Sequence, residues 1–328
     1  MTNENKISDP KVANLDVFRE SKSLGREAWE RLIRNRAAVA GMILIGFFLL
    51  VAIFAPFIAP ENPLKINDGK GYLPPPWFKG QTAKVGEWKH LLGTDTLGRD
   101  VLSRTIYGAR VSMVVAVIPT LIILLIGTTV GMLAGYVGGR TDNTLMRITD
   151  VIYAFPDLLF FIIVMVALRD SPIGRAFNGM LLLFVAFAIV NWVGAARLTR
   201  GQALSLKNKE FVEASRSIGV KDSRIMTRHI LPNSLSPLIV YSALLIPGLI
   251  ITEAILGYLG IGLRPATDPN AIFITSWGAL MLEGQTAINT QPWILFAPAL
   301  CIALIVLSFT FLGDGLRDAL DPRMRGTQ

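Results

Sequence analysis

The stretch AVAGMILIGFFLLVAIFAPFIA, residues 38–59, decides the fold class. It contains no charged residue, and it is about as long as the ~20 residues that a helix needs to cross a bilayer. A helix on a soluble protein is apolar along one stripe, whereas this stretch is apolar on every side. The sequence therefore predicts a transmembrane helix over Ala38–Ala59.

Later stretches share this length and apolar character. They are Val111–Tyr136, Thr149–Leu168, Met180–Ala196, Leu235–Leu259 and Trp293–Gly313. Across the 328 residues, 52% are hydrophobic and 17% are charged, whereas about a quarter of the residues in a soluble domain are charged. The sequence therefore predicts an all-α, polytopic membrane protein with about six transmembrane helices.

The segments between these spans are polar and divide the chain. Residues 1–37 are expected to be a cytoplasmic N-terminal segment, with an amphipathic interfacial helix from Lys22 to Arg36. An ordinary solvated lead-in is the alternative there. Residues 60–108 are expected to form an extracellular loop, 109–315 a five-helix core with a cytoplasmic loop over 200–233, and 316–328 a cytoplasmic tail.

The distribution of Lys and Arg predicts the orientation. The net charge is +8, and basic residues gather after the second span, after the fourth span and in the tail. Basic residues beside spans favour the cytoplasmic side, so both termini are expected on the cytoplasmic side of the cell inner or plasma membrane. The basic 60–108 segment is long enough to be translocated regardless of its charge. Because the basic residues lie beside apolar stretches and are not interleaved with aromatics, nucleic acid is not an expected partner.

Four glycines of the second span recur at every fourth position. They are Gly127, Gly131, Gly135 and Gly139. This spacing places them on one face of a helix, where a neighbouring backbone can approach closely. We expect them to serve helix packing, with a pore-lining role as the alternative.

Two carboxylates within or beside spans are candidates for the transport pathway or its gating. Glu253 lies well inside the fifth span, where a charge is costly, so it should face the interior or a water-filled cavity and have a partner. A structural, hydrogen-bonded role for it stays equally open. Asp157 follows Pro156 and is expected to share a helix face with Asp150. Prolines interrupt several spans and favour bent helices: Pro119, Pro156, Pro237, Pro247 and Pro298.

The sequence contains no pattern typical of catalysis or metal binding. The glycines over 257–262 lack both a preceding strand and a following Lys-Ser or Lys-Thr, so they do not form a phosphate-binding loop. The two histidines, His90 and His229, stand far apart without ligand spacing. The chain is therefore expected to be non-catalytic and to bind no metal or cofactor itself.

The segment KEFVEASRSIG, residues 209–219, predicts a short helix between the fourth and fifth spans. One face of it is expected to hold Phe211, Ala214, Ser215 and Ile218. Gly219 should end the helix, because glycine adopts the left-handed cap conformation without strain. A second short helix is expected from Asp222 or Ser223 to a stop near Pro232. Such a hairpin cannot bury its apolar face alone and needs a partner protein.

This segment resembles the coupling loop of bacterial ABC importer permeases. The family pattern is Glu-Ala-Ala, three residues, Gly, nine residues, Ile, one residue and Leu-Pro. The matching positions here are Glu213, Ala214, Gly219, Leu231 and Pro232. The chain departs from the pattern at Ser215, in place of Ala, and at His229, in place of Ile.

Two more segments narrow the resemblance to the C-type subunit of oligopeptide and dipeptide importers. They are residues 90–110, which contain HLLGTDTLGRDVLSR, and residues 313–323, GDGLRDALDPR. With the coupling loop, the resemblance covers most of the chain after the first forty residues. The cluster Asp95, Arg99 and Asp100 is expected to form an ion-paired turn, with a binding site as the alternative.

The resemblance implies a type I ABC importer permease fold, with residues 109–315 as the permease core and 200–233 as its coupling loop, and a place in a larger complex. A related second permease subunit would complete the pathway, two ATPases would bind ATP and Mg, and an extracellular solute-binding protein would deliver peptide. Coupling to the ATPase would fall on Phe211, Glu213, Ala214, Ser215, Ile218, Gly219, Leu231 and Pro232. Alternatives are a permease for nickel or glutathione, and, from other classes, a secondary transporter or a membrane-bound enzyme.

Overall fold

The computed structural model describes residues 24–78, 84–268 and 271–321. Every regular element within these residues is helical, and their one isolated β-bridge joins Thr94 and Asp100. The predicted all-α class is therefore confirmed. Residues 1–23 of the predicted N-terminal segment and 322–328 of the predicted tail lie outside the described residues.

Five described helices are long and apolar enough to cross a membrane. They are α2 (Arg36–Ile58), α3 (Val101–Val137), α7 (Met180–Leu206), α10 (Leu231–Tyr258) and α12 (Trp293–Leu320). A sixth span exists if the bent pair α4 (Gly139–Tyr153) and α5 (Asp157–Ala167) is counted as one. The shorter helices are α1 (Leu24–Leu32), α6 (Pro172–Arg175), the 3₁₀ turn η1 (Ala176–Gly179), α8 (Glu210–Ser217), α9 (Asp222–Ile225), the π turn η2 (Met226–Ile230) and α11 (Trp277–Thr286).

The third predicted span, Thr149–Leu168, is wrong as a single helix. The axes of α4 and α5 meet at 79°. Pro156 precedes α5 as its N-cap, in an extended conformation. A proline cannot donate a backbone hydrogen bond, and it disfavours helical geometry in the residue before it, so the helix breaks here. The other prolines that were expected to bend spans, such as Pro119 and Pro298, lie inside continuous helices.

Several helices extend beyond the apolar stretches that predicted them. Helix α3 begins at Val101, because the carboxylate of Asp100 accepts a 2.7 Å hydrogen bond from the backbone N–H of Ser103 and caps it. The predicted outer loop over 60–108 therefore ends at residue 100. Helix α7 continues to Leu206, which shortens the loop predicted over 200–233. Hydropathy marks the part of a helix that suits lipid, and the helices continue into polar turns beyond it.

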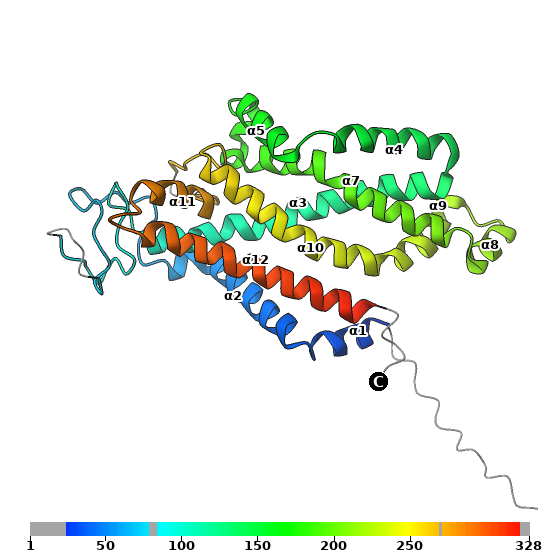
Figure 1. Cartoon of the computed structure of the whole chain (residues 1–328), viewed down its shortest axis with the longest axis horizontal. Coiled ribbons are helices and arrows are strands. Elements are labelled where there is room, and N and C mark those ends of the chain that lie inside the picture. The colour runs from blue at the N-terminus through cyan, green and yellow to red at the C-terminus, as the bar shows by residue number, and fades with distance from the viewer. Residues whose placement is uncertain (1–23, 79–83, 269–270, 322–328) are drawn as a thin grey trace, which may run out of the picture.

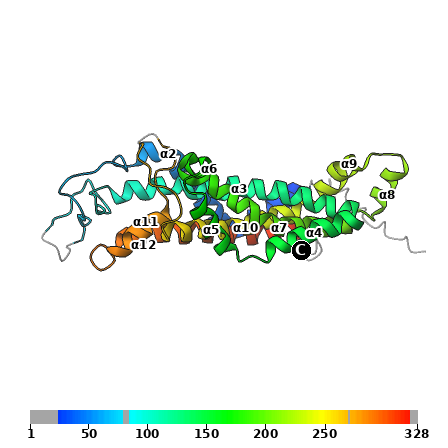
Figure 2. The same ribbon diagram turned by 90° about the horizontal axis from the view of Figure 1, so that it is seen from above.

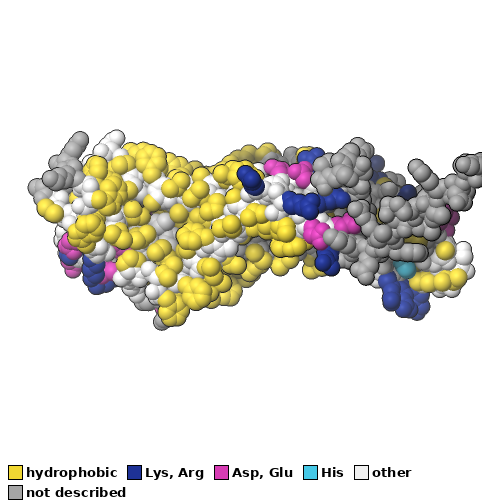
Figure 3. Space-filling model, turned by 90° about the horizontal axis from the view of Figure 1, so that it is seen from below, with side chains coloured by type: hydrophobic (Ala, Val, Ile, Leu, Met, Phe, Trp, Pro, Cys, Tyr) yellow, Lys and Arg dark blue, Asp and Glu magenta, His cyan; other side chains and the backbone are white. Residues whose placement is uncertain are grey.

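The helices run lengthwise, and the connecting segments gather at the two ends (Figure 1). At one end, here called the α8 end, lie α8, α9, α1 and the last turns of α12; Figure 2 shows α8 and α9 projecting there. At the opposite end, the α11 end, lie residues 59–78 and 84–100 together with α11. Hydrophobic side chains cover a wide, continuous part of the face seen in Figure 3. Such a surface suits contact with lipid.

Three of the predicted glycines, Gly127, Gly131 and Gly135, lie in α3 directly against α7. A Cβ atom on Gly127 would stand 2.6 Å from the carbonyl oxygen of Trp192, and one on Gly135 would stand 2.6 Å from that of Arg200. Gly131 lies between them against the carbonyl of Ala196. The two backbones are therefore in contact over two helical turns. Gly139 does not share this ridge, so that prediction is wrong: it begins α4 with φ +56° and has no neighbour within 4 Å of its Cβ position.

Buried ion pairs hold the α11 end together. Arg104 of α3 is 4% exposed, and it donates to Asp95 at 2.5 Å and to Glu283 of α11 at 2.8 Å. Arg99 bridges the same two carboxylates at 2.7 and 3.2 Å. The expected pairing of Asp95 with Arg99 is present, and Glu283 extends it to a helix that the sequence did not predict. Asp100 does not pair with Arg99 as expected: its carboxylate lies 2.9 Å from Nδ1 of His90 and caps α3.

Glu61 anchors the first part of the segment between α2 and α3. Its carboxylate pairs with Lys89, accepts from Asn67 at 3.3 Å and lies 3.4 Å from Lys65. Burial raises the pKa of Glu61, but the hydrogen bonds from Lys89, Asn67 and Lys65 outweigh it and lower the pKa from 4.5 to about 2.

We predict that replacing Gly131 with Val destabilises the bundle. The added side chain must push α7 away, and such overpacking costs about 1–3 kcal/mol. Thermal unfolding of the purified protein measures the loss. Gly46→Val is the matched control, because nothing lies within 4 Å of the Cβ position of Gly46. Equal unfolding temperatures for the two variants would contradict the packing role.

We also predict a loss of stability as the pH falls from 4.5 towards 2. The pKa of Glu61 is lower in the folded chain than its ordinary value of 4.5, so the ionised carboxylate stabilises the fold above that pH, and protonation removes this contribution. Unfolding temperatures across this range measure it. Glu61→Gln should flatten the profile, whereas Asp68→Asn, at an exposed site in the same segment, should not. A profile of unchanged steepness in Glu61→Gln would refute the assignment.

Candidate functional site

The loop between α7 and α10 carries the strongest sequence signal, and it projects at the α8 end (Figure 1). Its first helix, α8, ends as the sequence predicts: Gly219 has φ +79°. The N–H of Gly219 donates to the carbonyl of Arg216 at 3.0 Å, and that of Val220 donates to Ser215 at 3.1 Å. This pair of bonds is a Schellman cap, which requires a left-handed residue and therefore favours glycine.

The two faces of α8 differ in what they contact. Phe211 is 42% exposed and Ile218 is 81% exposed, and Glu213 and Ala214 are exposed beside them. Ser215 does not share that face, contrary to the prediction: it is buried, and its hydroxyl donates to the carbonyl of Phe211 at 2.7 Å. The outer face of α8 thus presents apolar side chains that the described chain covers only in part: Ile218 is open, and the ring of Phe211 lies 6.4 Å from that of His229.

The inner face of α8 is held by Val212, which sequence reasoning missed. Val212 belongs to a small buried cluster drawn from the loop and from two long helices: Met132, Tyr136, Ala203, Val212, Ile225 and Ile230. Val212 and Ser215 are three residues apart, a spacing that places both on one helix face. This spacing was the sequence signal that could have identified the buried face of α8. The loop is therefore attached to α3 and α7, with its opposite face free.

The prediction that the second short helix stops near Pro232 is wrong. Helix α9 passes through the π turn η2 directly into α10, whose first turn contains Pro232. The N–H of Leu231 bonds to the carbonyl of Met226, five residues back. A proline in the first turn of a helix removes no needed donor, so it is tolerated there. Leu231 and Pro232 thus begin a long helix and do not end a hairpin.

Glu253 is buried in α10 at 1% exposure. The side chain of Ser276, the N-cap of α11, lies beside it. Even so, neither carboxylate oxygen makes a hydrogen bond within the described residues. The expected burial is present and the expected partner is not found there. A buried carboxylate without a partner carries a large desolvation cost, which makes it sensitive to any movement around it.

Asp157 lies exposed in the first turn of α5, where the helix N-terminus favours a negative charge. The expectation that it shares a helix face with Asp150 is wrong, because the chain bends between them. Asp150 instead pairs with Arg197 of α7 at 2.7 Å. Asp157 is therefore placed at the break between α4 and α5, away from the buried core.

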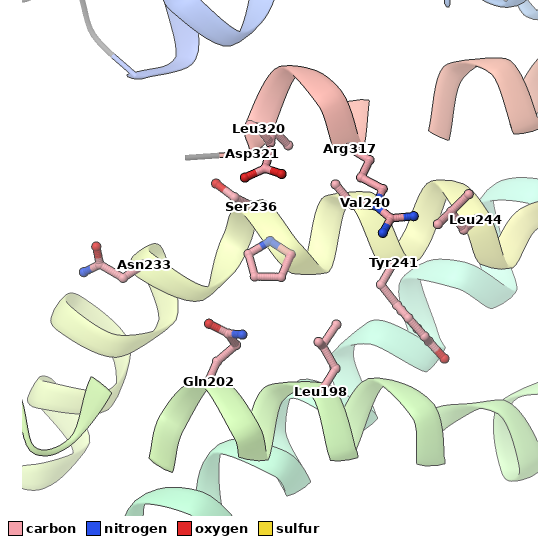
Figure 4. Close-up of a pocket in the computed structure, with 11 residues that line it drawn as sticks. Leu198, Gln202, Asn233, Ser236, Val240, Tyr241, Leu244, Arg317, Leu320 and Asp321 are labelled. Carbon is pink, nitrogen blue, oxygen red and sulfur yellow. The ribbon is translucent and has the colours of Figure 1, made fainter. Parts of the chain in front are cut away.

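A cavity of about 660 Å³ lies between α7, α10 and α12 on the side of the α8 end. Figure 4 shows Gln202 and Leu198 reaching into it from α7, Ser236 and Tyr241 on α10, and Arg317 of α12 above. No sequence pattern pointed to it, since its lining residues come from three helices far apart in the chain. Its lining is mixed: polar side chains such as Gln202, Ser236 and Arg317 lie among apolar ones.

Comparisons with known proteins agree with this architecture. Residues 127–326 match the family described as binding-protein-dependent transport system inner membrane component, and residues 23–75 match the N-terminal TM domain of oligopeptide transport permease C. A solved inward-facing MetNI methionine ABC transporter superposes with a TM-score of 0.50 at 16% identity, over 66% of this chain and 96% of that one.

Curated relatives match nearly the whole chain. The oligopeptide transport system permease protein OppC of Haemophilus influenzae is 40% identical over 93% of this chain and 91% of its own length. The dipeptide transport system permease protein DppC of Bacillus subtilis is 39% identical over 94% and 89%. The glutathione transport system permease protein GsiD of Pectobacterium atrosepticum is 37% identical over 96% and 97%. The chain therefore belongs to the binding-protein-dependent transport system inner membrane components, as a multi-pass ABC importer permease subunit of the oligopeptide and dipeptide type.

Proposed function

We propose that this chain forms half of the translocation pathway of an ATP-driven importer of oligopeptides or dipeptides. A related permease subunit forms the other half, two ATPase subunits bind ATP and Mg, and an extracellular solute-binding protein delivers peptide. The α8 end and both termini lie in the cytoplasm, and the α11 end faces outward. The names of the curated relatives support the substrate class. The exposed face of α8 is the observation that supports docking of an ATPase subunit.

The outer face of α8 has the properties of a docking surface. Phe211 and Ile218 are exposed on α8, a short helix that projects at the end of the bundle (Figure 1). Val212 fixes the opposite face in a buried cluster, so the helix is held ready for a partner. An amphipathic helix of this kind fits a hydrophobic groove on another protein.

Each predicted coupling residue has a distinct part in this docking. Phe211, Ala214 and Ile218 make the apolar contact, with Glu213 as the charged side chain beside them. Gly219 shapes the cap that ends α8. Ser215 and Leu231 hold the loop on its inner side, and Pro232 lies in the first turn of α10.

Closure of the ATPases on ATP would displace α8, and the long helices would follow as packed bodies. Shifts of this kind move rigid helices about a few hinge residues. The α4–α5 break at Pro156, beside Asp157, is one place where the chain can bend without breaking helix hydrogen bonds. Glu253 is the proposed gating residue in α10, because its unpartnered carboxylate makes the outward half of that helix sensitive to rearrangement.

A glutathione importer is the second candidate, supported by the relative from Pectobacterium atrosepticum. Reconstitution of the complete complex in vesicles, with labelled dipeptide, oligopeptide or glutathione outside, separates the candidates. ATP-dependent accumulation of a peptide supports the proposal. If only glutathione accumulates, glutathione replaces peptides as the proposed substrate. Uptake that needs no ATPase would refute the proposal that the complex is an ATP-driven importer.

We predict that Ile218→Asp weakens binding of the ATPase while the chain still inserts and folds. The substitution places a charge in the centre of the apolar contact, and truncating a central interface residue costs about 2 kcal/mol or more. Co-purification with the ATPase measures it. Thr227→Asp, at an exposed site of η2 in the same loop, is the charge-matched control. Normal retention of the ATPase by Ile218→Asp would remove α8 as the docking helix.

We predict that Glu253→Gln changes the rate of peptide uptake by about fivefold or more, which is the size of a typical coupling between two sites. The unfolding temperature should stay equal or rise. Glutamine keeps the shape of the side chain and removes the cost of a buried charge. Initial rates of uptake and thermal unfolding are compared in the same preparations. Unchanged uptake kinetics would return Glu253 to a structural role.

A further inference from the structure

Tyr136 contacts both helices of the α8 loop from a different part of the chain. It lies in the last turn of α3, 7% exposed. Its hydroxyl donates to a carboxylate oxygen of Asp222 in α9 at 2.5 Å and accepts from the guanidinium of Arg216 in α8 at 3.3 Å. The same guanidinium stands 5.8 Å from the centre of the tyrosine ring.

The arrangement requires a hydroxyl. A tyrosine hydroxyl donates one hydrogen bond and accepts others at the same time, so it can join a carboxylate to a guanidinium. Both bonds involve a charged partner, and hydrogen bonds of this kind are stronger than those between neutral groups. Arg216 and Asp222 are themselves exposed, so water can solvate them when the hydroxyl is removed. Loss of the hydroxyl therefore changes the position of the loop more than the stability of the fold.

Within the described residues, side-chain contacts join this loop to α3. Along the chain, the loop continues from α7 through residues 207–209 and into α10 through the π turn η2. Helix α3 has no such connection, since Tyr136 and Asp222 are 86 positions apart. The apolar contacts of Met132 and Tyr136 with Val212 hold the loop near α3. Such contacts have no preferred direction, whereas the two hydrogen bonds fix how α8 and α9 are turned.

Helix α3 is in turn the helix whose glycines bring it against α7. A displacement that reaches the end of α3 therefore moves two spans together. We propose that Tyr136 is a positioning residue that fixes α8 and α9 relative to α3, so that a displacement of α8 by its ATPase partner is passed to the α3–α7 pair. This inference rests on the proposed docking of α8.

The test uses the complete complex in vesicles and compares Tyr136→Phe with the unmodified chain. We expect normal retention of the ATPase, continued ATP hydrolysis, an unchanged unfolding temperature and about tenfold fewer peptides imported per ATP hydrolysed. Tenfold corresponds to about 1.4 kcal/mol, which is close to the net contribution of a single hydrogen bond. Because the hydroxyl and the carboxylate act through one link, adding Asp222→Asn to Tyr136→Phe should lower the ratio no further.

Tyr153→Phe is the matched control. Tyr153 is an exposed tyrosine of α4 with a guanidinium, that of Arg197, 4.5 Å from its ring centre, and removal of its hydroxyl should leave the ratio unchanged. An unchanged ratio in Tyr136→Phe would overturn the inference, and so would loss of ATPase binding in that variant, because the residue would then build the docking surface. Failure of the unmodified chain to retain the ATPase would overturn the proposed docking of α8 instead.

Discussion

The close contact between α3 and α7 is the constraint on which the rest of the bundle depends. Apolar side chains gain little by leaving lipid for one another, so helices in a membrane associate where their backbones approach closely. Gly127, Gly131 and Gly135 allow this approach over two turns. The same two helices then supply the buried residues against which the α8 loop packs. A change in the spacing of α3 and α7 would therefore reach the loop directly.

The sequence predicted the features that depend on local chemistry. Apolar length located the spans, a four-residue glycine period identified the packing face of α3, and Gly219 was placed at a left-handed helix end. Each of these follows from the backbone or side chain of a few neighbouring residues. For the same reason, the break before α5 was only partly anticipated: Pro156 was noted, but a 79° change of direction depends on how α5 packs on α7.

Features that join distant residues could not be predicted in this way. Arg104 and Glu283 are 179 positions apart, and no local pattern links them. The burial of Val212, rather than of Phe211, depends on which side of α8 meets α3 and α7. The prediction that Pro232 ends a helix was wrong. A proline disrupts a helix where its missing N–H would have donated a hydrogen bond. Here the π turn η2 changes the hydrogen-bonding pattern just before Pro232, which lies in the first turn of α10.

The two ends of the molecule are held by different interactions, and this difference bears on how it can move. At the α11 end, the buried Arg104 joins the buried Asp95 to the partly exposed Glu283, and separating Arg104 from Asp95 would leave two buried charges with an uncompensated desolvation cost. At the α8 end, the loop is held by a small apolar cluster and by hydrogen bonds whose charged partners are exposed, so their rearrangement costs less. A displacement imposed by a partner protein would therefore rearrange contacts at the α8 end first. The displacement would then reach the α11 end through long helices such as α3 and α10. In α10, the carboxylate of Glu253 has no hydrogen-bond partner in the described residues, so no such bond would hold it in place during this movement.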